Sequence, residues 1–66
     1  MRITINGREQ QTQPGVSVTA LLESLGFDPK KIAVERNLEI VPRSLHPTTM
    51  LEDGDKLEIV NFVGGG

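Results

Sequence analysis

The sequence has no cysteine, no tryptophan and no tyrosine, and its single histidine is His46. A disulfide is therefore excluded, and one histidine without cysteine cannot build a structural zinc site. At 66 residues the chain has room for one small domain, which buries only about 60% of the surface of its unfolded chain. We expect a fold held by packing and hydrogen bonds, with no large active-site cleft and no metal bound by this chain.

Long apolar runs and basic stripes are also missing. No apolar run exceeds three residues, so we expect no membrane span. Seven basic and nine acidic residues give a net charge of −2, and the longest basic run is Lys30-Lys31, which disfavours nucleic acid as a partner. The first residues show no signal-peptide core and the absence of cysteine fits a reducing compartment, so we expect a cytoplasmic protein.

The N-terminal residues alternate polar and apolar side chains, which predicts a half-buried strand over residues 2–6. Asn6-Gly7 follows, and this pair favours a type I′ hairpin turn because both residues tolerate positive φ. The returning segment, residues 8–13, is polar on both faces, as expected of a strand at the edge of a sheet. Pro14-Gly15 ends it.

Ser17 begins the one clear helical pattern. It is a favourable N-cap residue, and the apolar residues after it have the spacing of one helical stripe: Val18, Leu21, Leu22 and Leu25. Gly26 is placed to end the helix in the left-handed conformation, and Pro29 prevents its continuation. The pattern predicts one short amphipathic helix.

Three further strands are predicted in the second half of the chain, over residues 32–35, 39–41 and 56–63. Asn37 suits the turn between the first two, Asp53-Gly54-Asp55 marks a turn before the third, and residues 43–51 are irregular. This order, with the last strand returning beside the first, indicates an α+β protein with a β-grasp fold. We expect a mixed sheet of four to five strands with one main helix packed on one face, in a domain over residues 1–63.

The last predicted strand is apolar on both faces. If Leu57 and Ile59 face the core, parity places Val60 and Phe62 on the opposite face, which a single helix does not cover. Exposed apolar patches mark partner surfaces, so we predict that Val60 and Phe62 bind a partner. The alternative is that Phe62 folds over an edge or packs on the 38–41 segment.

Gly64, Gly65 and Gly66 alone indicate only a flexible tail over residues 64–66. Six blocks spread over the whole chain give the tail its context: Asn6-Gly7, Val18-x-x-Leu21-Leu22, Val34-Glu35-Arg36-Asn37, Ile40-Val41-Pro42-Arg43, Asp53-Gly54-Asp55 and Phe62-Val63-Gly64-Gly65-Gly66. With these blocks the chain resembles the ubiquitin-like sulfur carriers, and among them the ThiS family. The third and the last block are the most specific to that family.

The resemblance implies a carrier protein rather than an enzyme, with no catalytic residue and no cofactor of its own. It implies that a ubiquitin-activating-like enzyme of the ThiF type, using ATP and its magnesium, adenylates the carboxylate of Gly66. Sulfur from a persulfide then forms a thiocarboxylate, which donates its sulfur to a thiazole synthase of the ThiG type in thiamine biosynthesis. In this picture Gly64 and Gly65 thread the partner's active site, and Val60 and Phe62 contact the partners.

Other functions stay open beside this one. A sulfur carrier for molybdopterin or for tRNA thiolation would use the same chemistry with another acceptor. A ubiquitin-like modifier would join Gly66 to a lysine through an isopeptide bond. A small enzyme has little support, because the chain offers no cysteine and no credible catalytic dyad or triad.

Several polar residues have plainer interpretations. His46 is predicted to be a surface loop histidine and not a ligand or a catalyst. Glu52, Asp53 and Asp55 lack the loop spacing of a calcium site, so they predict a turn, in which Asp53 and Asp55 add to an acidic surface that attracts basic partners. For Arg36 and Arg43 the sequence favours neither a partner contact nor simple solvation.

Overall fold

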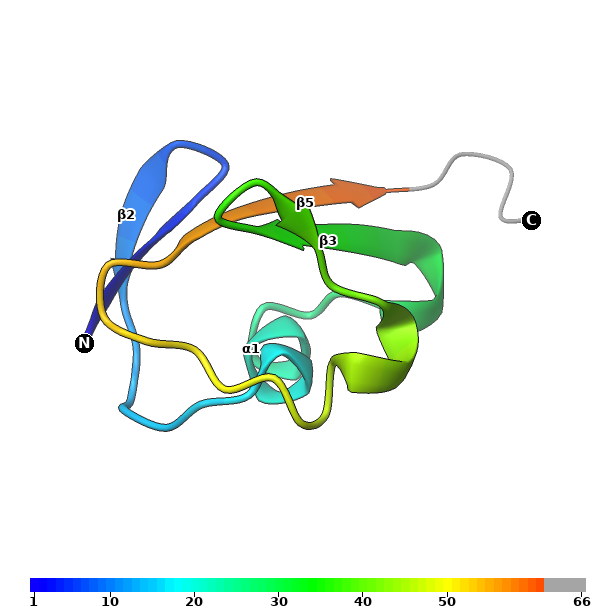
Figure 1. The fold of residues 1–66 in the computed structure, drawn as a ribbon, viewed down its shortest axis with the longest axis horizontal. Coiled ribbons are helices and arrows are strands. Elements are labelled where there is room, and N and C mark those ends of the chain that lie inside the picture. Colours follow the sequence, from blue (N-terminus) through cyan, green and yellow to red (C-terminus); the bar gives the residue numbers. More distant parts are fainter. Residues whose placement is uncertain (62–66) are drawn as a thin grey trace.

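The structure, a computed structural model, describes residues 1–61. Its strands and main helix follow the predicted order, a hairpin, one helix and three further strands (Figure 1). The elements are β1 (Arg2–Ile5), β2 (Arg8–Gln11), α1 (Val18–Ser24), the 3-10 turn η1 (Pro29–Lys31), β3 (Ile32–Arg36), β4 (Glu39–Ile40), the 3-10 turn η2 (Arg43–Leu45) and β5 (Lys56–Asn61).

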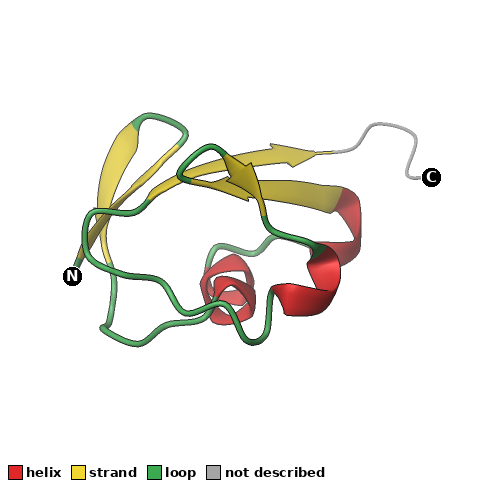
Figure 2. Ribbon diagram, in the orientation of Figure 1, coloured by secondary structure: helices red, strands yellow, loops and turns green. Residues whose placement is uncertain are grey.

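The strands form one mixed sheet in the order β2-β1-β5-β3-β4. The last strand, β5, pairs in parallel with β1 and antiparallel with β3, so the first and last strands lie side by side at the centre of the sheet. Helix α1 and the segment before β5 lie below the sheet, and no segment within residues 1–61 covers its other face (Figures 1 and 2). The predicted mixed sheet with one main helix on one face is confirmed.

The first hairpin follows its sequence closely. Asn6 and Gly7 have φ values of 50° and 83°, the left-handed conformations that a type I′ turn requires. In the register of β1 and β2, Ile5 lies opposite Arg8, so Asn6 and Gly7 alone make the turn. β2 is an edge strand, and its polar composition protects the edge from pairing with other chains.

Helix α1 is bounded by the caps that the sequence predicts. The Ser17 hydroxyl accepts a hydrogen bond of 3.0 Å from the N–H of Ala20. At the other end Gly26 has a φ of 80°, its N–H donates to Glu23, and the N–H of Phe27 donates to Leu22, which is the Schellman arrangement.

The core fills the space between the sheet and α1, and Phe27 and Val16 pack against it. The prediction that Leu25 belongs to the buried stripe is wrong, because the helix ends at Ser24 and Leu25, its C-cap, is exposed. The buried hydrophobic residues are Ile3, Ile5, Val18, Leu21, Leu22, Ile32, Val34, Val41, Leu51, Leu57 and Ile59.

His46 is buried, so the prediction of a surface histidine is wrong. Only 3% of its surface is exposed, because the η2 turn directs the ring inward, where its Nε2 lies 3.0 Å from the carbonyl oxygen of Val41. Since a carbonyl only accepts, Nε2 carries the hydrogen. The Nδ1 atom is buried and has no hydrogen-bond partner in the described part of the chain. The ring therefore has a structural role beneath β4.

Two predictions concern residues that the structure does not describe. The predicted end of the last strand at residue 63, and the boundary between a domain over residues 1–63 and a tail over residues 64–66, lie outside the described residues. Within residues 1–61, no helix has the length and the apolar character needed to cross a membrane.

Candidate functional site

Strand β5 leads to the glycine tail, and its residues alternate between the core and the open face of the sheet. Leu57 and Ile59 are buried, whereas Val60 is 56% exposed, so the predicted parity is confirmed for Val60. In the register with β3, Val60 lies opposite Ala33 and Asn61 lies opposite Ile32. Val60 is therefore presented on the uncovered face one residue before the described chain ends.

Four of the predicted site residues lie outside the described residues: Phe62, Gly64, Gly65 and Gly66. Their predicted roles, and the alternative packing of Phe62 on the 38–41 segment, stay predictions.

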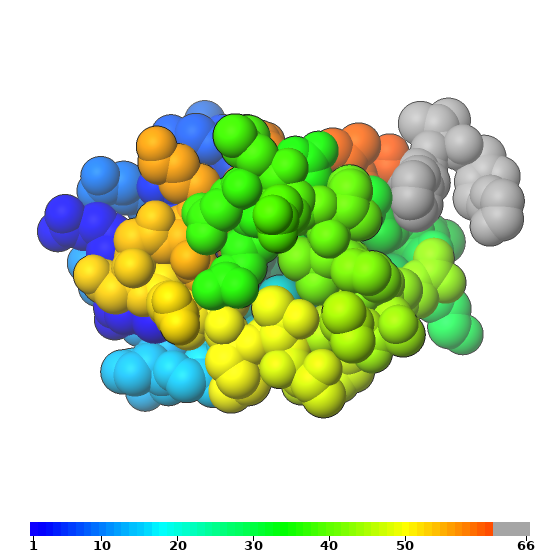
Figure 3. Space-filling model, in the orientation of Figure 1, coloured from blue at the N-terminus to red at the C-terminus, as the bar shows by residue number. Residues whose placement is uncertain are grey.

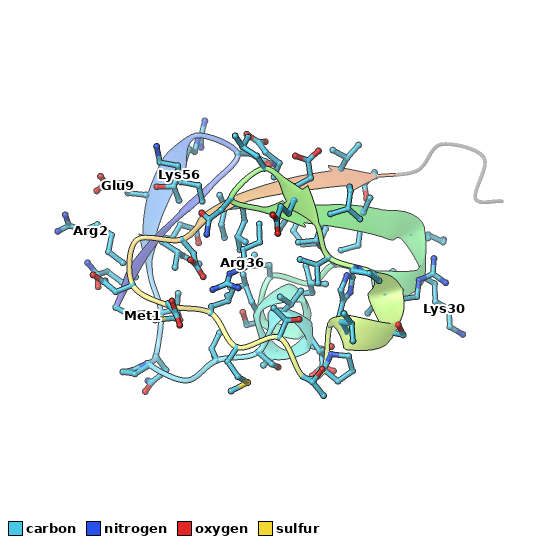
Figure 4. All side chains as sticks on the ribbon, in the orientation of Figure 1. Met1, Arg2, Glu9, Lys30, Arg36 and Lys56 are labelled. Carbon is cyan, nitrogen blue, oxygen red and sulfur yellow. The ribbon has the colours of Figure 1, made fainter. Side chains whose placement is uncertain are left out.

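An ion pair between the buried Asp55 and the partly exposed Arg36 fixes the beginning of β5. Asp55 is 5% exposed, and its carboxylate accepts hydrogen bonds from the Nε of Arg36 at 2.8 Å, the N–H of Glu52 at 2.8 Å and the Nδ2 of Asn37 at 3.0 Å. The prediction that Asp55 belongs to an acidic surface is therefore wrong, because Arg36 on β3 draws it inward. Figure 4 shows Arg36 on the helix side of the sheet, away from the open face. Asp53 is exposed and accepts from the N–H of Arg2 at 2.8 Å.

This environment shifts the pKa of both charged groups. Burial alone raises the pKa of Asp55, but the hydrogen bonds from Arg36, the Glu52 N–H and Asn37 outweigh burial and hold it below its usual value. The hydrogen bond to Asp55 raises the pKa of Arg36. Both groups are therefore charged at neutral pH, and the pair anchors β5 to the β3–β4 hairpin.

Two asparagines with positive φ fasten β5 from its two sides. On the β3 side, the Oδ1 of Asn37 accepts from the N–H of Lys56 at 2.9 Å. On the β1 side, the side-chain amide of Asn6 accepts from the N–H of Ile59 at 2.8 Å and donates to its carbonyl oxygen at 3.1 Å. The Asn6 amide thus takes the place of a strand residue where β1 has ended, and it supports β5 directly before Val60.

The open face around Val60 includes two apolar residues that the sequence analysis did not select. Leu38, at the tip of the β3–β4 hairpin, is 90% exposed, and Ile40, opposite Glu35 in the register, is 64% exposed. A signal for Leu38 was available, because leucine stands in a turn position that favours glycine. The position of Ile40 on the open face follows from its pairing with Glu35, and only the register of the strands shows that pairing.

Arg43 and Lys30 lie at the end of the molecule from which β5 leaves the sheet. The Nη2 of Arg43 donates to the carbonyl oxygen of Lys30 at 3.2 Å, and Figure 4 shows Lys30 at that end. The η1 turn that contains Lys30 leads directly into Ile32, the partner of Asn61. In the described part of the chain, no group of three or more histidine, aspartate and glutamate side chains is placed to hold a metal ion.

Comparison with known proteins places these features in a family. The model of the ThiS family matches residues 3–66. The chain is 54% identical to a thiazole synthase of Paramagnetospirillum magneticum over its whole length, although it spans only 20% of that protein.

Relatives of similar length complete the comparison. The chain is 35% identical to the sulfur carrier protein ThiS of Bacillus subtilis, over 97% of this chain and 98% of that protein. The crystal structure of the thiamine biosynthesis protein ThiS from Geobacter metallireducens is 33% identical, with a TM-score of 0.86 over the full length of both chains. This chain therefore belongs to the ThiS family.

Proposed function

We propose that this chain is a sulfur carrier of thiamine biosynthesis that holds the sulfur as a thiocarboxylate at Gly66. The observation that carries the proposal is the extent of the family match, which runs from residue 3 to residue 66 and so includes the glycine tail. The exposed position of Val60 on the open face supports it, since a carrier has to dock on the enzymes that load and unload it. The chain acts in this proposal as a co-substrate and not as an enzyme.

The chemistry begins at the main-chain carboxylate of Gly66. A carboxylate is a poor acyl donor because oxide is a very poor leaving group, so an adenylating partner of the ThiF type first joins it to AMP and releases pyrophosphate from ATP. The outer sulfur of a persulfide then attacks the acyl carbon and displaces AMP. A second thiol cleaves the S–S bond of the resulting acyl disulfide, which releases the thiocarboxylate and leaves a disulfide between the two thiols. ATP and its magnesium are bound by the partner, which also supplies the acid and base groups, while this chain presents the carboxylate.

Two further features belong to the proposal. Gly64 and Gly65 enter the partner's active site, where a tail without side chains needs the least space. Val60 and Phe62 bind the adenylating enzyme and then thiazole synthase, which takes the sulfur into the thiazole ring. The 54% sequence identity between this chain and one fifth of a protein named thiazole synthase supports the second association.

The test is the intact mass of the chain purified from cells grown without thiamine. We expect a species in which sulfur replaces one oxygen at Gly66. This species should be more abundant without thiamine than with it. Its detection would also show that Gly66 carries a free carboxyl group in the cell. Removal of Gly66 should leave a folded domain that accepts no sulfur. A thiocarboxylate on the shortened chain would contradict the proposal, and a mass increase from attachment to lysines of other proteins would favour a protein modifier.

Phe62→Ala tests the anchoring role in the same system. Truncation of a buried aromatic anchor costs about 2 kcal/mol or more, so we expect the affinity for the adenylating enzyme to fall at least about tenfold while folding is unchanged. An unchanged affinity in a calorimetric titration would remove Phe62 from the proposed surface. A thiocarboxylate whose abundance does not respond to thiamine, and whose sulfur is not transferred to thiazole synthase, would favour the molybdopterin or tRNA acceptor.

A further inference from the structure

Leu38 occupies a backbone position that is unfavourable for leucine. Its φ is 72°, in the left-handed region that L-residues with a side chain avoid. It is also 90% exposed, so it gains almost nothing from burial within this chain. An unfavourable conformation that the fold does not reward points to a role outside the fold.

The first hairpin shows that the fold does not need a leucine at such a place. Gly7 has the same position in its turn, after an asparagine, with a φ of 83°. Both turns are two residues long and both asparagines bond to β5. Glycine therefore satisfies the backbone in one turn, while the other turn carries an exposed leucine.

Leu38 lies next to other exposed apolar residues. Ile40 lies opposite Glu35, and Val60 lies opposite Ala33 on the same face of β3, so Ile40 and Val60 are on the uncovered face of the sheet. We call Leu38, Ile40 and Val60 the hairpin patch. Figure 3 shows the β3–β4 region, in green, at the surface of the molecule on the side that faces the viewer.

Two glutamates and one lysine share the open face with the hairpin patch. Glu35 and Glu58 lie directly opposite each other on β3 and β5, and Lys56 lies two residues before Glu58 on the same face of β5. Like charges in this position repel. The ion pairs among residues 1–61 are Arg2 with Glu9 and Arg36 with Glu52 and Asp55, so neither glutamate of the opposed pair is neutralised there.

These observations say which chemistry a partner surface needs. An apolar pocket would accommodate Leu38 and Ile40, and arginine or lysine side chains at its border would neutralise Glu35 and Glu58. A second copy of this chain is a poorer occupant, because each copy brings these two carboxylates and only one lysine, Lys56, to the contact. We propose that Leu38 inserts into an apolar, arginine- or lysine-bordered pocket on the adenylating enzyme that receives the tail.

This proposal rests on the proposed function and names the contact that makes the docking selective. It adds the β3–β4 hairpin, which is far from the tail in sequence, to the anchors at the end of β5. Leu38 is then a specificity-determining residue: it improves binding of the partner at the expense of the turn's own backbone preference.

The test is a titration of the purified adenylating enzyme with the full chain and its variants. For Leu38→Gly we expect at least about a tenfold loss of affinity, as for an interface anchor, together with an unfolding temperature equal to or above that of the parent. Leu38→Asn, which also suits a positive φ, should lose affinity in the same way. Met50→Ala is the matched control: Met50 is 49% exposed and pairs with Ser17 at the start of α1, so its truncation should leave the affinity unchanged.

A charge variant tests the border of the pocket. Glu58→Gln should slow association and weaken its dependence on salt, because it removes one of the charges that attract the basic border. An affinity of Leu38→Gly within twofold of the parent overturns the proposal, as does an increase in affinity for Glu58→Gln. A parent chain that self-associates through Leu38 in sedimentation, or that does not bind the enzyme, also overturns it.

The two proposals fail in different ways. If the parent chain carries no thiocarboxylate but binds the enzyme through Leu38, the proposed function is wrong and the hairpin contact stands. If the parent carries a thiocarboxylate and Leu38→Gly binds and reacts like the parent, the proposed function stands and the hairpin contact is wrong.

Discussion

The two hairpins of this small sheet have nearly the same backbone and are stabilised differently. In each, an asparagine with φ near 50° begins the turn and bonds to β5, at Ile59 for Asn6 and at Lys56 for Asn37. The first turn continues with Gly7 and contacts β5 only through neutral amide hydrogen bonds. The second turn continues with Leu38, and its Asn37 also donates a hydrogen bond to the buried carboxylate of Asp55.

The difference between the two hairpins separates residues that the fold requires from an exposed residue that is available to a partner. The first hairpin uses the residue pair that its turn prefers, so its sequence is explained by folding alone. The second departs from that preference at an exposed tip, and a buried ion pair with Arg36 holds its base in place. A rigid base and an unfavourable exposed leucine are suited to presenting a side chain to a partner.

The largest expected effect is on the buried pair behind the second hairpin. Asp55→Ala leaves Arg36, Asn37 and the N–H of Glu52 without their acceptor, so the free energy of unfolding should fall by about 3 kcal/mol. Urea unfolding followed by circular dichroism measures it. The control is Asp53→Ala, which removes one exposed hydrogen bond to Arg2 and should cost about 1 kcal/mol or less. Similar losses for both variants would contradict a special role for the buried pair.

Lowering the pH should gradually remove the stabilisation that the Asp55 carboxylate provides. The pKa of Asp55 is lower in the folded chain than in the unfolded chain, where the pKa of an aspartate is about 3.9. Its contribution is therefore fully present above that unfolded value and is lost as the pH falls through the folded pKa. Urea unfolding of the parent and of Asp55→Asn at a series of pH values should show a stability difference that shrinks toward zero in acid. A difference that is constant with pH would contradict the assignment.

Removing the asparagine side chains tests the two turns directly. Glycine keeps the positive φ available, so Asn6→Gly and Asn37→Gly report chiefly the lost side-chain hydrogen bonds. We expect a loss of about 2 kcal/mol for Asn6→Gly and a larger loss for Asn37→Gly, because one of the Asn37 bonds goes to a charged carboxylate. Equal losses, or a larger one at Asn6, would show that the charged network adds nothing to the second hairpin.

The parts of the fold that local signals determine were predictable from the sequence. Ser17, Gly26 and the Asn6-Gly7 pair each act within a few residues, and strand parity placed Val60 on the open face. The burial of Asp55 was not predictable, because it depends on Arg36, which is 19 residues away.

The same limit applies to the candidate site. The bond from Asn6 to Ile59 spans 53 residues, and Ile40 is placed by the register of a strand only two residues long. His46 was judged from its neighbours in the sequence, whereas its burial comes from the η2 turn folding it against Val41. Long-range packing decides such cases, and a single sequence does not show it.

The smallest expected effect comes from exchanging the second turn residues, and it tests the comparison most directly. A Cβ atom added at Gly7 would meet nothing within 4 Å, so we expect the cost of Gly7→Leu to come mainly from the backbone conformation and to be about 1 kcal/mol. Leu38→Gly relieves the same strain but gives the unfolded chain more freedom, so we expect a gain of only about 0.5 kcal/mol. Thermal unfolding of both variants, with Gly7→Asn as a near-neutral control, measures the pair. A clear loss of stability for Leu38→Gly would mean that the leucine serves the fold, and the second hairpin would then differ from the first in packing rather than in what it presents to a partner.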